Sequence, residues 1–186
     1  WTPDGRVMFS TNSLATLPSS QLLAIDPKTG ASERVPLYEA DQGAYDKAGG
    51  TLFFTRLPFQ GSHTKRYKGG FIQQLWSFSP GAAEAVPLTA DFEGTSKDPM
   101  CFGGRVYFSS DRDGIMNIWS MTADGKDLKQ HTTHAEFDVS NPALDNGRIV
   151  YQLGADLRLL DVRSGADAPI DITLASDFDQ LREKWV

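Results

Sequence analysis

One five-residue pattern recurs four times along this 186-residue chain. The copies begin at residues 6, 51, 105 and 148 and read RVMFS, TLFFT, RVYFS and RIVYQ. Apolar and β-branched side chains at every second position favour a strand over a helix. Successive copies start 45, 54 and 43 residues apart. A recurrence of this size predicts a repeat protein whose units each contain this anchor strand.

A second strand pattern follows each anchor strand. The four copies are QLLAID from Gln21, QLWSFS from Gln74, NIWSMT from Asn117 and DLRLLD from Asp156. A turn then leads to a short final strand such as SERVPL or EAVPLT. In the third copy the turns contain Asp113-Gly114 and Asp124-Gly125, which supply the positive φ that tight turns require. Each unit is therefore expected to be an antiparallel meander.

Units of roughly 40 to 50 residues with four short strands are typical of β-propeller blades. We therefore expect an all-β fold: a β-propeller segment of about four blades, each a four-stranded antiparallel sheet. The expected blade units are residues 1–37, 38–89, 90–134 and 135–174, and residues 175–186 would start a next blade or form a linker.

Composition excludes several classes of function. The formal net charge of −6 argues against a nucleic-acid-binding surface, which would be basic. No apolar run reaches the roughly 18 residues that a membrane span requires. The single cysteine, Cys101, cannot form an internal disulfide, and we expect it to be a small buried residue rather than a nucleophile. The compartment stays open between cytoplasm and periplasm.

The two ends of the sequence predict a piece of a longer protein. The chain begins with WTPDGRVMF, which reads as the turn before an anchor strand, with the preceding strand missing. After REKWV no new anchor strand follows. A propeller segment left open in this way would expose apolar sheet faces, so we expect it to self-associate or to be marginally stable alone.

Three stretches carry a family resemblance. Residues 111–132, DRDG-x₂-NIW-x-M-x₂-DG-x₂-LK-x-HT, resemble the propeller repeat shared by the periplasmic Tol-system propeller protein and the tricorn proteases. RYKGGFIQQLW at 66–76 and the run from RIVYQLGADLRLLDVRSG at 148–165 to the closing ASDFDQLREKWV resemble the first propeller of tricorn-type proteases. The similarity extends over residues 1–186.

The resemblance implies a role within a large serine peptidase that trims oligopeptides. This chain would be a non-catalytic segment of its first, six-bladed propeller, acting as a scaffold and as a passage or gate for peptides. The implied partners are peptides, the remaining blades and domains of the longer protein, and further copies in a homo-oligomer. No catalytic residue is expected here, because the family's catalytic residues lie downstream. No metal or cofactor is expected either, because the sequence has no Cys/His metal pattern and no phosphate-binding glycine loop.

The loop HTKRYKGG is the candidate binding element. It gathers His63, Lys65, Arg66 and Lys68 inside the longest hairpin of an acidic chain. Long loops in compact repeats are often functional, and basic side chains could bind a peptide's terminal carboxylate or acidic side chains. The alternative is an exposed loop that contacts only water or the next domain of the longer protein.

Other patterns have a structural explanation that we favour. His131 and His134 could be two metal ligands, but a site needs a third, so we expect a turn between blades. DRDG lacks the glycine and the acidic residue that a calcium loop carries at its sixth and twelfth positions, which favours a simple turn. The recurring aromatic residues are expected to pack between blades. They are Phe9, Phe54, Phe108, Tyr151, Trp76 and Trp119.

Two alternative functions belong to other classes. A free-standing Tol-type propeller would mediate protein–protein interaction with no protease attached. A propeller cap of an oligopeptidase with an α/β-hydrolase domain is a third reading. The sequence beyond Val186 would distinguish them, because only a tricorn-like protein would continue into a second propeller, a PDZ-like module and a peptidase region.

Overall fold

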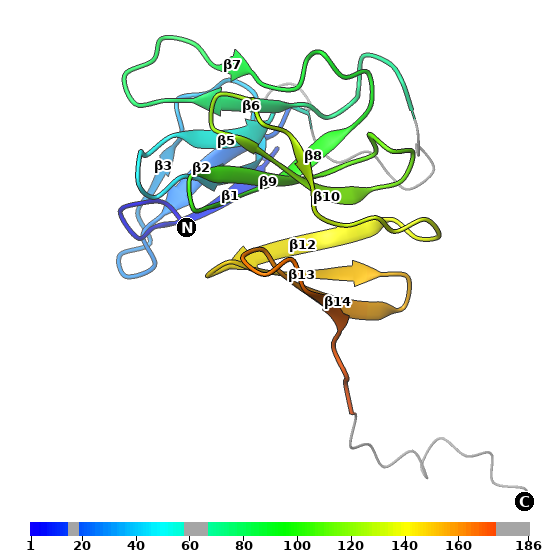
Figure 1. Ribbon diagram of the computed structural model, residues 1–186. Helices are drawn as coiled ribbons and strands as arrows, with labels where there is room; N and C mark the ends of the chain where they lie inside the picture. The colour runs from blue at the N-terminus through cyan, green and yellow to red at the C-terminus, as the bar shows by residue number, and fades with distance from the viewer. Residues whose placement is uncertain (15–18, 58–66, 174–186) are drawn as a thin grey trace, which may run out of the picture.

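The computed structural model describes residues 1–14, 19–57 and 67–173. Within these residues the chain forms four antiparallel sheets, each made from consecutive strands (Figure 1). No helix in the described residues is long and apolar enough to cross a bilayer. The expected all-β propeller fold with about four blades is confirmed.

The strands follow the predicted meanders. The first sheet consists of β1 (Val7–Thr11), β2 (Gln21–Ile25) and β3 (Ser32–Arg34). The second consists of β4 (Asp41–Tyr45), β5 (Leu52–Thr55), β6 (Leu75–Phe78) and β7 (Val86–Pro87). The third consists of β8 (Ser96–Phe102), β9 (Arg105–Ser110), β10 (Asn117–Thr122) and β11 (Lys129–Gln130). The fourth consists of β12 (Val139–Asp145), β13 (Arg148–Leu153), β14 (Asp156–Asp161) and β15 (Asp167–Pro169). Among the described residues, the first sheet therefore has three strands, with β1 and β3 at its edges.

The Asp-Gly pairs form the turns that their sequence predicts. Gly114 and Gly125 have φ angles of 97° and 81°, in the region that glycine enters without steric cost. The amide of Gly114 donates to the carbonyl of Asp111, and the amide of Gly125 donates to that of Thr122, both at 2.9 Å. These turns reverse the chain between β9, β10 and β11.

Apolar clusters fill the space between consecutive sheets. Each cluster combines the third residue of one anchor strand with the second and fourth residues of the next, because alternate residues of a strand point to opposite faces. The sets are Met8 with Leu52 and Phe54, Phe53 with Val106 and Phe108, and Tyr107 with Ile149 and Tyr151. Every junction therefore uses the same positions of the repeat.

The burial of the fourth anchor residue depends on a neighbouring sheet. Phe54, Phe108 and Tyr151 are 1%, 0% and 1% exposed, as expected for packing between blades, but Phe9 is 41% exposed. Phe9 lies on the face of the first sheet that points away from the second. The same position is thus core in three sheets and surface in one.

Replacing the fourth anchor residue by alanine should therefore lower the free energy of unfolding by different amounts in different sheets. We expect Phe108→Ala to lower the free energy of unfolding by about 3–5 kcal/mol, because it leaves a cavity in a filled junction. Phe9→Ala should cost less than about 1 kcal/mol. Urea unfolding at the lowest practical protein concentration measures both, and equal losses would contradict the packing scheme.

Candidate functional site

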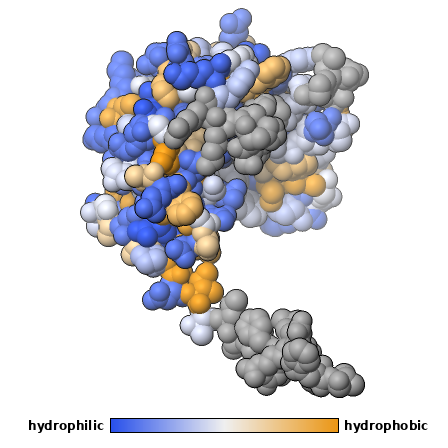
Figure 2. All heavy atoms as spheres, turned by 90° about the vertical axis from the view of Figure 1, so that its right-hand side faces the viewer, coloured by the Kyte–Doolittle hydropathy of each residue, from blue (hydrophilic) through white to orange (hydrophobic). Residues whose placement is uncertain are grey.

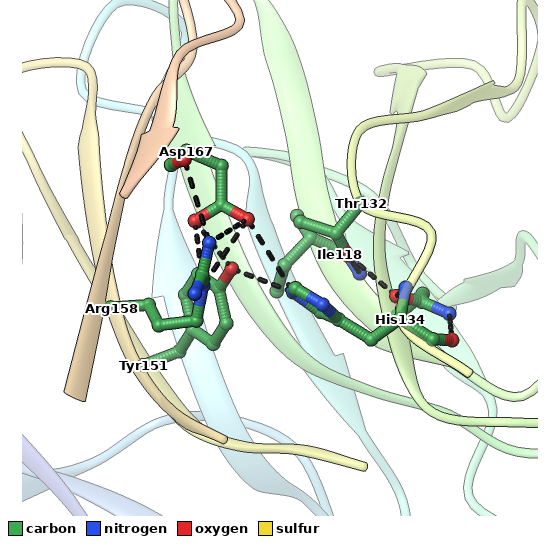
Figure 3. Close-up of polar contacts among 7 residues, drawn as sticks. Ile118, Thr132, His134, Tyr151, Arg158 and Asp167 are labelled. Atoms are coloured by element: carbon green, nitrogen blue, oxygen red, sulfur yellow. Dashed lines mark hydrogen bonds and ion pairs between the residues drawn. The ribbon is translucent and has the colours of Figure 1, made fainter. Parts of the chain in front are cut away.

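A polar network lies at the junction between the third and fourth sheets (Figure 3). Tyr151 comes from β13, Arg158 from β14 and Asp167 from β15, while His134 lies in the segment between β11 and β12. Arg158 pairs with Tyr151 across the strands as Trp119 pairs with Phe108 and Trp76 with Phe54. The fourth sheet thus has an arginine where the second and third have tryptophan.

Asp167 is the centre of this network. The Tyr151 hydroxyl donates to Asp167 Oδ1 at 2.8 Å. The Arg158 guanidinium donates through Nε to Oδ1 and through Nη2 to Oδ2, each at 3.1 Å. Two parallel bonds between guanidinium and carboxylate are stronger and more directional than bonds between neutral groups. Burial and the Asp167 carboxylate raise the pKa of Tyr151, which stays protonated and keeps donating.

His134 closes the network from the other side. Its Nε2 lies 2.9 Å from the Tyr151 hydroxyl oxygen and 3.5 Å from Asp167 Oδ2. Since the Tyr151 proton is directed at Asp167, the hydroxyl oxygen accepts a bond from His134, which assigns the ring proton to Nε2. Burial lowers the pKa of His134, outweighing the attraction of Asp167. The imidazole is therefore neutral at pH 7.

A side-chain clamp fixes the position of His134. The backbone amide of His134 donates to Asn117 Oδ1 at 2.9 Å, and Asn117 Nδ2 donates to the His134 carbonyl at 3.1 Å. The Thr132 hydroxyl donates to the same Oδ1 at 2.8 Å and accepts from the Ile118 amide at 2.9 Å. In the preceding unit Thr89 accepts from the Leu75 amide at 3.0 Å. In both units, a threonine in the segment after the fourth strand thus bonds to a backbone amide near the start of the third strand.

A second histidine contacts a serine but does not form a catalytic pair. Ser120 Oγ accepts a bond from Arg105 Nε at 2.9 Å and lies 2.8 Å from His131 Nε2. Ser120 is 0% exposed and cannot reach a substrate. His131 and His134 both lie in the segment between β11 and β12, and they contact different residues, Ser120 and Tyr151. In residues 1–14, 19–57 and 67–173, no three His, Cys, Asp or Glu side chains gather closely enough to hold a metal ion.

The first strands of the second, third and fourth sheets carry an irregularity that repeats. We call these strands, β4, β8 and β12, the inner strands, because β8 contacts both of the others. Each has a register shift against its anchor strand. At the shift stand Gln42, Asp98 and Asn141, with φ of 44°, 54° and 49°. Two residues there oppose one, which is a β-bulge.

The bulges connect neighbouring inner strands. Gln42 Nε2 donates to Asp98 Oδ1 at 2.9 Å, and the Asp98 amide donates to Gln42 Oε1 at 3.2 Å. Gln73 Nε2 donates to the same Oε1 at 3.2 Å. Burial raises the pKa of Asp98 although Lys97 Nζ is 3.8 Å from its Oδ2. Asn141, on the last inner strand, is exposed.

The residues predicted to bind substrate are only partly described. His63, Lys65 and Arg66 lie outside the described residues, and Lys68 is exposed. Cys101 is partly buried, and burial raises the pKa of its thiol to about 12, in line with a structural role. The bulges were not predicted from the sequence. A signal for them exists, because the pairs Gln42-Gly43, Asp98-Pro99 and Asn141-Pro142 each precede an anchor strand at a similar distance.

Comparison with known proteins places this geometry in a family. The model of the tricorn protease N-terminal β-propeller domain matches residues 1–166. The chain belongs to this family. A putative tricorn protease homologue 2 from Streptomyces coelicolor is 36% identical over 128 residues, which cover 67% of this chain and 10% of that protein. The resemblance to the tricorn first propeller is thereby confirmed.

Solved structures agree with this assignment. A crystal structure of the tricorn protease superposes with a TM-score of 0.83 and 25% identity, covering 95% of this chain and 17% of that one. A putative TolB from Agrobacterium tumefaciens gives a TM-score of 0.65 at 16% identity, with 90% and 62% covered, which shows a shared fold alone. The chain spans between 10% and 17% of the length of the curated tricorn relatives that it matches.

The neutral state of His134 predicts a pH-dependent stability. A histidine whose pKa is lower in the folded than in the unfolded chain stabilises the fold above the unfolded value of about 6.5, and this contribution is lost as the pH falls. Burial also lowers the pKa of His131. The melting temperature should therefore decrease between about pH 7 and pH 5.5, and His134→Gln should flatten part of that decrease. Parallel profiles for the variant and the unmodified chain would contradict the assignment.

Proposed function

We propose that this chain is a non-catalytic propeller segment of a tricorn-like serine protease that degrades oligopeptides, and that it acts as a scaffold and peptide passage. Membership of the tricorn N-terminal propeller family supports the first part. Ser120, the serine that contacts His131, is fully buried and would not act as a nucleophile on a peptide.

The observation that carries the passage role is the row of bulged inner strands. The register shifts in β4, β8 and β12 place polar residues at equivalent points of adjacent strands. Polar groups at this edge, of which Asn141 is exposed, would suit an extended peptide, whose backbone needs hydrogen-bonding partners along its whole length. Steric selection at such a passage would admit unfolded peptides and exclude folded proteins.

The loop between β5 and β6 completes the proposal. His63, Lys65, Arg66 and Lys68 would bind the terminal carboxylate or the acidic side chains of a peptide through charge-assisted hydrogen bonds. The other blades of a six-bladed ring, the remaining domains of the longer protein and further copies in a homo-oligomer would surround this segment. A free-standing Tol-type interaction propeller is the second candidate, supported by the fold-level likeness to TolB.

The passage role is tested by narrowing the inner edge in the full-length protein. Asn141→Cys, in a background without other cysteines, allows a bulky maleimide to be attached at the exposed inner strand. We expect the label to lower kcat/KM severalfold for long peptides and to leave cleavage of very short peptides unchanged. Chromatographic analysis of the products from peptides of graded length measures this.

The matched control is Ser32→Cys, an exposed residue on the outermost strand of the first sheet. Its label should leave cleavage of peptides of every length unchanged. Equal inhibition from both positions, or no effect of the Asn141 label on long peptides, would contradict the passage role. A full-length product without peptidase activity would instead favour the Tol-type alternative.

A further inference from the structure

Arg112 is a partly buried arginine that lacks a hydrogen-bonding partner. It lies in the loop between β9 and β10, and its guanidinium carbon is 4.4 Å from the centre of the Phe92 ring. Its Nε atom is buried, and in the described part of the chain no hydrogen bond or ion pair reaches the guanidinium. Burial lowers the pKa of Arg112, and the nearby carboxylates of Asp91 and Asp111 offset this only in part.

Other arginines in similar surroundings have partners. Arg56 also lies over an aromatic ring, but it forms an ion pair with Glu39. Arg163 lies over a ring as well, and it donates to the carbonyl of Asn146. The other partly buried arginines of the described residues each pair with a carboxylate, and they are Arg6, Arg105 and Arg158. A carboxylate is therefore the group that the surroundings of Arg112 lack.

The loop that carries Arg112 is fastened beside the start of an inner strand. Asp111 Oδ1 accepts a bond from the Thr95 amide at 2.8 Å, and the Ser110 hydroxyl donates to the Thr95 carbonyl at 2.8 Å. The next residue, Ser96, begins β8. The loop leaves the third sheet at the right-hand side of Figure 1, and Figure 2 shows that side face-on, with hydrophobic areas set among hydrophilic ones.

We propose that Arg112 binds a carboxylate of a peptide at this end of the passage, either an acidic side chain or the C terminus. The two terminal nitrogens of the guanidinium keep contact with solvent, and together they form the planar fork that a carboxylate binds through two parallel bonds. Stacking on Phe92 restrains the guanidinium beforehand, so less side-chain freedom is lost on binding.

The carboxylate site follows from the contacts of Arg112, whereas a peptide as the carrier of the carboxylate rests on the proposed function. Of the segments outside the described residues, 15–18 and 58–66 contain no aspartate or glutamate, and only 174–186 contains acidic residues. A carboxylate from another molecule is thus the partner that we test.

Binding of labelled peptides to the full-length protein tests the proposal by fluorescence anisotropy, after a serine-directed inhibitor has blocked cleavage. Three neutral-backbone peptides of equal length are compared: one with an internal glutamate and an amidated C terminus, one with glutamine instead, and one with glutamine and a free C terminus. We expect one or both carboxylate peptides to bind at least about tenfold more tightly than the neutral one, and less tightly as salt is added. The peptide that binds more tightly identifies the source of the carboxylate.

Arg112→Gln should raise the Kd of that peptide by about tenfold and leave the Kd of the neutral peptide unchanged. Arg112→Lys keeps the charge but loses the fork, so its Kd should fall between the two. Arg148→Gln is the matched control, because Arg148 is exposed and lies at the start of β13, at the opposite end of its sheet from the loop after the second strand. This control should change none of the three Kd values.

The outcomes separate the carboxylate site from the proposed function. Carboxylate peptides that bind no better than the neutral one, equal weakening of all three peptides by Arg112→Gln, or an equal effect of Arg148→Gln would overturn the site. Binding that depends on Arg112 in a full-length protein without peptidase activity would support the site and contradict only the protease proposal.

Discussion

The apolar junction between consecutive sheets is the interaction on which the rest of this structure depends. A short antiparallel sheet has two faces, and a meander of four strands cannot bury either face by itself. Here the face of one sheet that carries the third anchor residue packs against the face of the next that carries the second and fourth, so that Phe53 contacts Val106 and Phe108. Sheets with a neighbour on both sides have buried anchor strands, as β5 shows along its whole length.

The junction before the fourth sheet keeps the geometry and changes the chemistry. Arg158 replaces the tryptophan found in the second and third sheets, and the ion pair with Asp167 gives the guanidinium the partner that a partly buried charge requires. Tyr151 keeps its ring in the apolar cluster and directs its hydroxyl to Asp167. The result is a junction that is more specific in orientation than an apolar one and sensitive to the protonation of His134.

The sequence predicted the repeat well because anchor strands and the turns between strands are local signals that recur at similar spacings. It did not predict the network, because Tyr151, Arg158 and Asp167 are brought together by strand register, and a sequence pattern does not specify which polar residues will face each other. The bulges at Gln42 and Asp98 were missed for a similar reason: a bulge is defined by two residues opposing one on the partner strand. The basic loop was predicted from composition, and of its four side chains the structure describes only Lys68.

The central claim is that one repeating junction between consecutive sheets holds this chain together. Amide hydrogen exchange of the 186-residue chain tests it most directly, because exchange reports opening strand by strand. The account predicts slower exchange in β5 and β9, each of which packs against a neighbouring sheet on both faces, than in β1 and β14. Equal protection of all four strands would contradict it.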